Sequence, residues 1–202
     1  MVLIKEDNKI TMDIMWKAVS DVSLEHLFLQ IEDNHIIANS AILTMKENNP
    51  IRVFYKVCCN LQWEVSEFSV EIFHGGYKNI SVKRDFHENW RTDQGKLLEN
   101  LKGCIDIDIS ATPFTNTIPI NRLSLKPGEC KEIKVVYVDI YSFSLTPVNQ
   151  RYTCLEAKTN TCKYKYENLD SGFAAEFFVD KNGLVIDYPN LCERVCNIDT
   201  CK

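Results

Sequence analysis

Residues 103–125 have the sequence GCIDIDISATPFTNTIPINRLSL. Isoleucine stands at every second position from Ile105 to Ile109, and Asp106 and Asp108 lie between the isoleucines. Because successive side chains of a strand point to opposite sides, this alternation predicts a strand with one apolar face and one acidic face.

The second half of this stretch has the spacing of a short helix. Pro113 ends the strand, because the residue before a proline is pushed toward extended geometry. Phe114, Ile118 and Leu125 follow at intervals of four and seven residues, with polar residues between them. This spacing places apolar side chains on one side of a helix, so we expect a short helix over residues 114–124.

Most of the remaining chain has the pattern of short strands separated by turn residues. Residues 10–31 fit a helix or a strand equally well, and the strands elsewhere favour strands there too. The other expected strands are residues 35–45, 51–59, 63–73, 79–85, 133–143, 152–155, 163–167, 173–179 and 184–188. Serial short strands of this kind are typical of an antiparallel meander. The sequence therefore predicts a mostly β protein.

The chain has the length of one domain, with 202 residues and no low-complexity linker that would divide it. We expect a single domain over residues 1–202, with a folded core from about 10–195 and a tail at 196–202. After Pro189 we expect irregular chain with at most one short turn.

Charge and composition narrow the classes of function. The net charge is −5 and no long basic run is present. Nucleic acid is therefore a poor candidate partner, because binding it requires clustered Lys and Arg. We find no secretory signal and no apolar run of transmembrane length. We therefore expect a cytoplasmic protein without a transmembrane segment, while its oligomeric state is not predicted.

Nine cysteines are present, which is a high and odd number. In a protein that is not exported, disulfides are disfavoured, so we expect reduced thiols. Cys192, Cys196 and Cys201 lie near the C-terminus but lack the close pairing of structural zinc ligands. No metal site is predicted.

Asp106 and Asp108 are the two polar residues whose spacing most suggests a functional site. At the strand rise of ~3.3 Å per residue they lie about 6–7 Å apart on one side of the strand. Two carboxylates at this spacing can act as acid and base or hold a cation. We favour the interpretation that they form a solvated face opposite the isoleucines, unless that face turns inward and pairs with Arg122.

Sequence motifs of common enzymes are absent. The chain contains no Gly-rich phosphate loop, no HExxH and no GxSxG. We therefore predict no catalytic residue and no cofactor. An enzyme that uses Asp106, Asp108 and Arg122 remains the alternative.

The DIDI run and the stretch TPFTNTIPINRL at residues 112–123 together form a long motif. This motif closely resembles the signature of the Putative glycolipid-binding family of bacterial proteins. Further similarity lies at Gln150–Thr153, Phe173–Glu176, Val179-Asp180, Gly183–Val185 and Asp187–Pro189, and more weakly at Trp16, Glu25-His26, Cys59-Asn60 and Trp63.

The resemblance implies a spiral β-roll, in which a many-stranded, largely antiparallel sheet wraps around one short central helix at about residues 114–124. It also implies that the partner is a glycolipid or another amphipathic small molecule. Three positions depart from the family pattern: Asn60, Ser66 and Asn121. The chain thus carries fewer positive groups near the helix, so an anionic head group is less well supported.

A curved sheet around a helix can open a mostly apolar groove with a few polar groups. The residues that we expect to bind a ligand there are Arg122, Asn116, Thr115, Asp108 and Asp106 as polar contacts, with Trp63, Trp90 and Tyr137 as apolar walls. In the alternative, Thr115 and Asn116 cap the helix and Arg122 pairs with one of the aspartates. The chain is then a structural or interaction domain without a small ligand.

Overall fold

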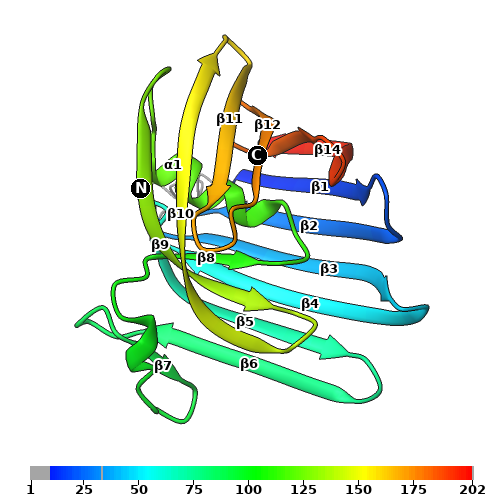
Figure 1. Ribbon diagram of the computed structural model, residues 1–202, viewed down its shortest axis with the longest axis vertical. Coiled ribbons are helices and arrows are strands. Elements are labelled where there is room, and N and C mark those ends of the chain that lie inside the picture. The colour runs from blue at the N-terminus through cyan, green and yellow to red at the C-terminus, as the bar shows by residue number, and fades with distance from the viewer. Residues whose placement is uncertain (1–9, 33, 202) are drawn as a thin grey trace, which may run out of the picture.

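The computed structural model describes residues 10–32 and 34–201, with the side chains of residues 199–201 excepted. Its main feature is one sheet of fourteen strands (Figure 1). The strands are β1 Ile10–Ala18, β2 Ser23–Ile31, β3 Ile36–Lys46, β4 Asn49–Cys59, β5 Val65–Phe73, β6 Tyr77–Arg84, β7 Trp90–Thr92, β8 Asp106–Ile109, β9 Cys130–Asp139, β10 Ser144–Ala157, β11 Thr161–Asn168, β12 Ala174–Asp180, β13 Val185–Tyr188 and β14 Cys192–Cys201. One α-helix, α1 Thr117–Leu123, follows a short 3₁₀ helix, Phe114–Asn116, within the described residues.

The sheet has the spatial order β7-β6-β5-β4-β3-β2-β1-β14-β13-β12-β11-β10-β9-β8. All neighbouring strands are antiparallel except β8 and β9, which are parallel. The sheet does not close, and β7 and β8 lie at its two ends. Figure 1 shows two wings, β1–β6 running across the picture and β9–β12 rising steeply beside them. The predicted mostly β fold, a spiral β-roll, is confirmed.

Apolar and polar residues alternate along these strands, so the apolar side chains lie on one side of the sheet and that side faces the core. In β4, every second residue from Ile51 to Cys59 is buried, whereas Arg52, Phe54 and Lys56 are exposed. Each large apolar side chain buried in this way contributes roughly 1.5–3 kcal/mol of hydrophobic stabilisation. The inward face of the sheet is therefore one side of an extended core.

The other side of that core is the stretch 104–123, which we call the inner segment. Its Ile107, Phe114 and Ile118 belong to the apolar cluster that includes the inward residues of β1–β6. Its Ile120 belongs to a second cluster with inward residues of β10–β13. The inner segment thus fills the space between the two wings, and both wings pack against it.

The helix α1 is short because its sequence stops it. Pro119 is the third residue of the helix, within the first turn, where a missing backbone N–H costs no hydrogen bond. Ser124 follows the last helical residue in a left-handed conformation with φ of 46°, and its N–H donates to the Ile120 carbonyl. The helix is therefore confined to the segment that the sheet buries.

Asn121 fastens the helix to the turn between β12 and β13. Its amide donates to the Thr117 carbonyl at 3.0 Å and to the Asn182 carbonyl at 2.9 Å. Gly183, next in that turn, has φ of +75°, and a Cβ built on it would lie 2.6 Å from the Asn121 amide nitrogen. Glycine is suited both to this positive φ and to the narrow space beside the Asn121 amide. Asn121, which departs from the family pattern, therefore makes a structural contact with this turn.

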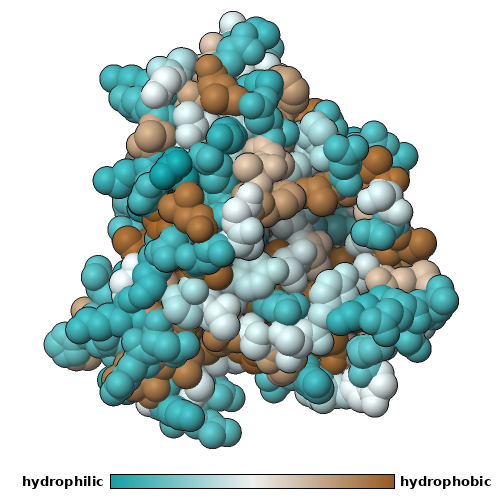
Figure 2. All heavy atoms as spheres, viewed as in Figure 1, coloured by the Kyte–Doolittle hydropathy of each residue, from teal (hydrophilic) through white to brown (hydrophobic). Residues whose placement is uncertain are grey.

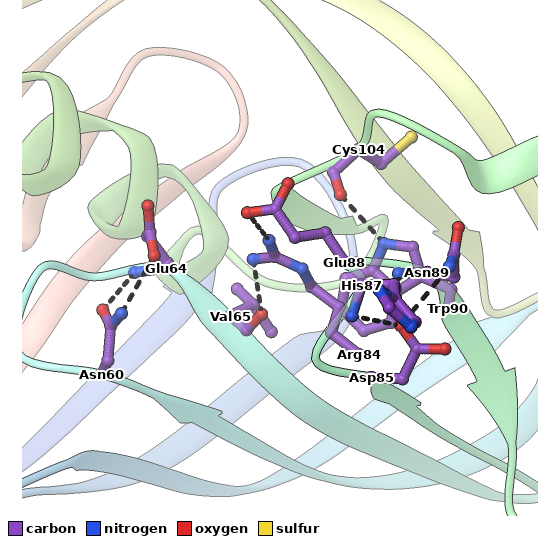
Figure 3. A network of polar contacts seen from close by, with 10 residues as sticks. All are labelled: Asn60, Glu64, Val65, Arg84, Asp85, His87, Glu88, Asn89, Trp90 and Cys104. Atoms are coloured by element: carbon purple, nitrogen blue, oxygen red, sulfur yellow. Dashed lines mark hydrogen bonds and ion pairs between the residues drawn. The ribbon is translucent and has the colours of Figure 1, made fainter.

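A polar network fastens the chain where it enters the inner segment (Figure 3). The indole N–H of Trp90 donates to the Cys104 carbonyl at 3.0 Å. Arg84 donates to the Val65 carbonyl at 3.2 Å and lies 3.5 Å from the Glu88 carboxylate. The Trp90 contact connects β7 to the start of the inner segment, and the Arg84 contacts connect β6 to β5 and to the turn before β7.

The structure resolves or corrects several expectations. Residues 10–31 form two strands, as favoured, and the helical stretch 114–123 matches the predicted 114–124. The expected irregular tail after Pro189 is wrong, because β14 pairs with β1 along its whole length up to Cys201. The tail was missed because the sequence CERVCNIDTC has few apolar residues, and its pairing partner lies at the other end of the chain.

Strand β10 begins at Ser144, earlier than the expected Tyr152, although it contains Pro147. Proline cannot donate a backbone hydrogen bond and normally excludes a central strand. Pairing of β10 with β11 starts only at Gln150, so Pro147 lies where β10 has β9 as its one neighbour. The backbone N–H that Pro147 lacks therefore belongs to the side of β10 that has no neighbouring strand.

Candidate functional site

Two adjoining cavities lie where the inner segment meets the sheet. The first has a volume of about 190 Å³ and the second about 270 Å³. Both are lined by Ser110, Thr112, Asn116, Tyr188 and Leu191, so they meet along a common wall. In the space-filling view, side chains of intermediate hydropathy gather near the middle of the face that is drawn, and hydrophilic ones gather along much of its edge (Figure 2).

Glu25 forms part of the wall of the first cavity and is only 2% exposed. Its Oε1 accepts hydrogen bonds from the hydroxyls of Tyr55 at 2.6 Å, Ser40 at 2.8 Å and Thr112 at 2.8 Å. These donors come from β4, β3 and the inner segment. Glu25 therefore connects the sheet to the inner segment through a buried polar cluster.

The second oxygen of Glu25, Oε2, is buried and has no hydrogen-bond partner in the described protein. Burial raises the pKa of the Glu25 carboxyl to about 7, and the hydrogen bonds from Tyr55, Thr112 and Ser40 oppose this rise. A carboxyl with such a pKa exchanges a proton near neutral pH. A buried oxygen without a partner in a cavity wall is a natural point of attachment for a ligand.

Three other buried polar atoms among the described residues lack a partner: Arg84 Nε, Thr117 Oγ1 and Gln150 Oε1. None of these three residues lines either cavity. Glu25 is distinguished from them because it is the one residue of the four that lines a cavity.

Asp108 lines the second cavity together with Tyr137 and Tyr166. Its carboxylate accepts hydrogen bonds from Gln150 at 2.6 Å, from Thr115 at 3.3 Å and from Tyr166 at 3.4 Å. Burial raises the pKa of Asp108, and these three donors oppose the rise. The structure thus gives Asp108 a complete set of protein partners beside the cavity.

Asn116 lines both cavities, and its side chain is held by the protein. Its amide donates to the Pro113 carbonyl at 3.2 Å, and its Oδ1 accepts from the Tyr152 hydroxyl at 2.9 Å. Thr115 accepts from the Ile109 N–H at 3.3 Å and donates to Asp108. Neither side chain makes a cap hydrogen bond to the helix, which differs from the capping alternative.

Asp106 and Arg122 form a buried ion pair that connects β8 to α1. Arg122 donates from Nε to Oδ1 at 2.9 Å and from Nη2 to Oδ2 at 2.5 Å. The side chain of Asp106 is fully buried and that of Arg122 is 16% exposed. Burial raises the pKa of the Asp106 carboxyl, and the two hydrogen bonds from Arg122 oppose that rise. The expected solvated acidic face is therefore wrong at Asp106, and the inward pairing with Arg122 is observed.

The three predicted aromatic walls lie in different surroundings. Tyr137 lines the second cavity. The ring of Trp90 is fully buried in the core, and Trp63 packs against that core, so neither lines the two cavities. Of the eight residues expected from the sequence, the cavities are lined by Asn116, Asp108 and Tyr137.

Sequence reasoning missed Glu25 and its partners Ser40, Tyr55 and Thr112. One signal was present: Leu27 and Leu29 share the side of β2 that carries Glu25, and all three are buried. A carboxylate in register with buried leucines indicates a buried acid.

The described residues contain no group of three or more His, Cys, Asp or Glu side chains placed to hold a metal ion. None of the helices in that part of the chain has the length and apolarity that crossing a bilayer requires. The cavity walls combine the carboxyl groups of Glu25 and Asp108 with several hydroxyls and an amide, and such a cluster can hydrogen-bond a hydroxylated ligand.

Comparison with known proteins places the chain in a family. The model of the Putative glycolipid-binding family matches residues 13–194. The chain belongs to this family. Its fold is similar to the crystal structure of a DUF1089 family protein from Pseudomonas aeruginosa, with a TM-score of 0.77 and 34% sequence identity over 89% of this chain and 95% of that one. None of the curated proteins matches the chain.

The family name is consistent with a lipid-binding role and identifies no specific ligand. The resemblance stated from the sequence is confirmed by this match. The motif at residues 112–123, which carried that resemblance, contributes Thr112 and Asn116 to the walls of both cavities.

The buried ion pair gives a first prediction. Replacing Asp106→Asn removes the charge opposite Arg122 and should lower the free energy of unfolding by about 3–5 kcal/mol. Arg122→Met in the same chain should restore part of the loss. Urea unfolding of both single variants and the double variant measures the coupling.

The exposed pair Arg151–Glu132, with side chains 36% and 61% exposed, is the matched control. Glu132→Gln should cost less than about 1 kcal/mol. If Asp106→Asn costs no more than Glu132→Gln, the buried pair does not hold β8 to the helix.

The raised pKa of Glu25 gives a second prediction. Its ordinary pKa is 4.5 and its folded value is about 7. Between these values the folded protein holds a proton that the unfolded chain releases, so Glu25 lowers the stability as the pH rises. The loss is complete above pH 7 and amounts to about 3 kcal/mol.

Glu25→Gln removes this ionisation. The free energy of unfolding of the variant, relative to that of wild type, should therefore rise by about 3 kcal/mol between pH 4.5 and pH 8. Urea unfolding at each pH measures this difference. Glu99→Gln, at an exposed glutamate, is the control and should show no such gain. A gain that is equal for the two variants would contradict the burial of an ionisable Glu25.

Proposed function

We propose that the protein binds a small amphipathic molecule of the glycolipid type, with its hydroxylated head group in the first cavity. The observation that carries this proposal is that Glu25 lines the first cavity and that its buried Oε2 has no partner in the described protein. The family name supports the same class of ligand.

The cavity sizes suit a head group better than a long chain. A volume of about 190 Å³ corresponds to the liquid volume of roughly six water molecules, at about 30 Å³ each. The second cavity continues past Thr112 and Asn116 and includes Phe173 and Leu191 in its walls. In the proposal the head group occupies the first cavity and the apolar part of the ligand extends along the second.

The residues expected from the sequence take different parts in this proposal. Asn116, Asp108 and Tyr137 are proposed ligand contacts, because they line the cavities. Arg122, Asp106 and Thr115 are proposed to hold those contacts in position, with Trp63 and Trp90 supporting the surrounding core. A non-catalytic role is proposed, since protein partners occupy the Asp106–Arg122 pair and Asp108.

The cytoplasmic location expected from the sequence stays a prediction. The eight cysteines whose side chains the structure describes are free thiols. This state is compatible with a reducing compartment.

Binding can be tested with a simple alkyl glycoside. We expect octyl glucoside, kept below its micelle concentration, to bind the full chain in calorimetry. Octyl phosphocholine, which has the same alkyl chain and no sugar, should bind at least about tenfold more weakly, a difference of 1.4 kcal/mol.

A cavity-filling variant links that binding to the first cavity. Ser23→Trp places an indole in the wall of the first cavity and should weaken octyl glucoside binding by about tenfold or more. Thr159→Trp, in the exposed turn between β10 and β11, is the matched control and should leave binding unchanged. The proposed function fails if octyl glucoside does not bind, or if both variants bind it as wild type does.

A further inference from the structure

The hydrogen bonds around Glu25 leave only one of its oxygens for a ligand. Each of the hydroxyls of Ser40, Tyr55 and Thr112 has one proton, and each donates it to Oε1. The Thr112 oxygen also accepts from the Phe114 N–H at 3.0 Å, which fixes its orientation. No donor from the described protein reaches Oε2.

The cavity provides no free cation for an ionised Glu25. Among the described residues that line it, Lys17 is the one with a cationic side chain, and its Nζ lies 2.6 Å from Glu193. A second acid, Asp21, also lines this cavity. A buried carboxylate without a paired cation is costly, so its neutral form is favoured once a ligand displaces water from the cavity.

We propose that Glu25 is a specificity residue that binds in its neutral acid form and donates the proton on Oε2 to an uncharged oxygen of the ligand head group. The acceptor is a hydroxyl, ether or carbonyl oxygen, as a neutral sugar presents. This inference rests on the proposed function and deepens it. Two consequences follow: an anionic head group is disfavoured beside two acids, and binding takes up a proton wherever Glu25 is ionised in the free protein.

Other titratable groups near Glu25 do not account for such a proton uptake near neutral pH. Burial raises the pKa of Tyr55 well above 10, and it also raises the pKa values of Tyr188 and Cys192, the latter to about 12. No histidine lines the cavity, and His26, the next residue along β2, is on the opposite face, 2.8 Å from Asp13. The charged and titratable residues that face Glu25 or share its cavity are Lys17, Asp21, Tyr55, Tyr141, Tyr188 and Cys192.

The test is calorimetry of octyl glucoside with the full chain between pH 6 and pH 8. We expect the affinity to fall about tenfold over this range, because the fraction of neutral Glu25 falls by that factor around its pKa. At pH 7.5, titrations in two buffers of different ionisation enthalpy should show net proton uptake on binding. This second measurement needs no variant.

Glu25→Gln keeps an oxygen acceptor and presents a permanent N–H donor, so it imitates the neutral acid. The variant should bind octyl glucoside with an affinity that does not change between pH 6 and pH 8. Asp21→Asn, in the same cavity wall, should keep the pH dependence of wild type. A wild-type affinity that is constant or rises with pH would overturn the inference, and a rise would indicate that the ionised carboxylate is the binding form. Absence of binding at every pH would instead overturn the proposed function.

Discussion

Burial of the inner segment is the constraint on which the rest of this structure depends. Residues 104–123 lie between two wings of one sheet, so their polar side chains must find partners inside the protein. Asp106 accepts hydrogen bonds from Arg122, and Asp108 accepts them from Gln150 and Thr115. Thr112 donates a hydrogen bond to Glu25. These contacts join β8 to α1 within the inner segment and connect the segment to β10 and β2, so the same hydrogen bonds that satisfy buried groups also fix where the wings meet.

Glu25 is a buried residue in the wall of a cavity, and its hydrogen-bonding capacity is only partly used. Its Oε1 accepts three hydrogen bonds and its Oε2 accepts none, although both are buried. Desolvation therefore dominates over the hydrogen bonds and raises the pKa of the carboxyl. A residue that lines a cavity therefore has one carboxyl oxygen without a hydrogen bond, and in our proposal a ligand supplies that hydrogen bond.

The sequence predicted what depends on local spacing. Period-two alternation identified β8, and the positions of Phe114 and Ile118 identified the helical stretch. The expectation of a solvated acidic face on β8 was wrong at Asp106, because the partner of Asp106 lies 16 residues away and meets it only through the helix. Likewise Glu25 and Thr112 are 87 residues apart, so no local pattern shows that they share a hydrogen bond. The pairing of β14 with β1 is a contact of the same long-range kind.

The most direct test of this account is the titration of the Glu25 carboxyl in the folded protein. Carbon-13 NMR of the glutamate side-chain carboxyls, with the Glu25 signal assigned by its absence in Glu25→Gln, measures its pKa without any ligand. The account predicts a midpoint near pH 7 for Glu25. A Glu25 midpoint close to its ordinary value of 4.5 would contradict the claim that a buried, incompletely bonded acid lies at the centre of the site.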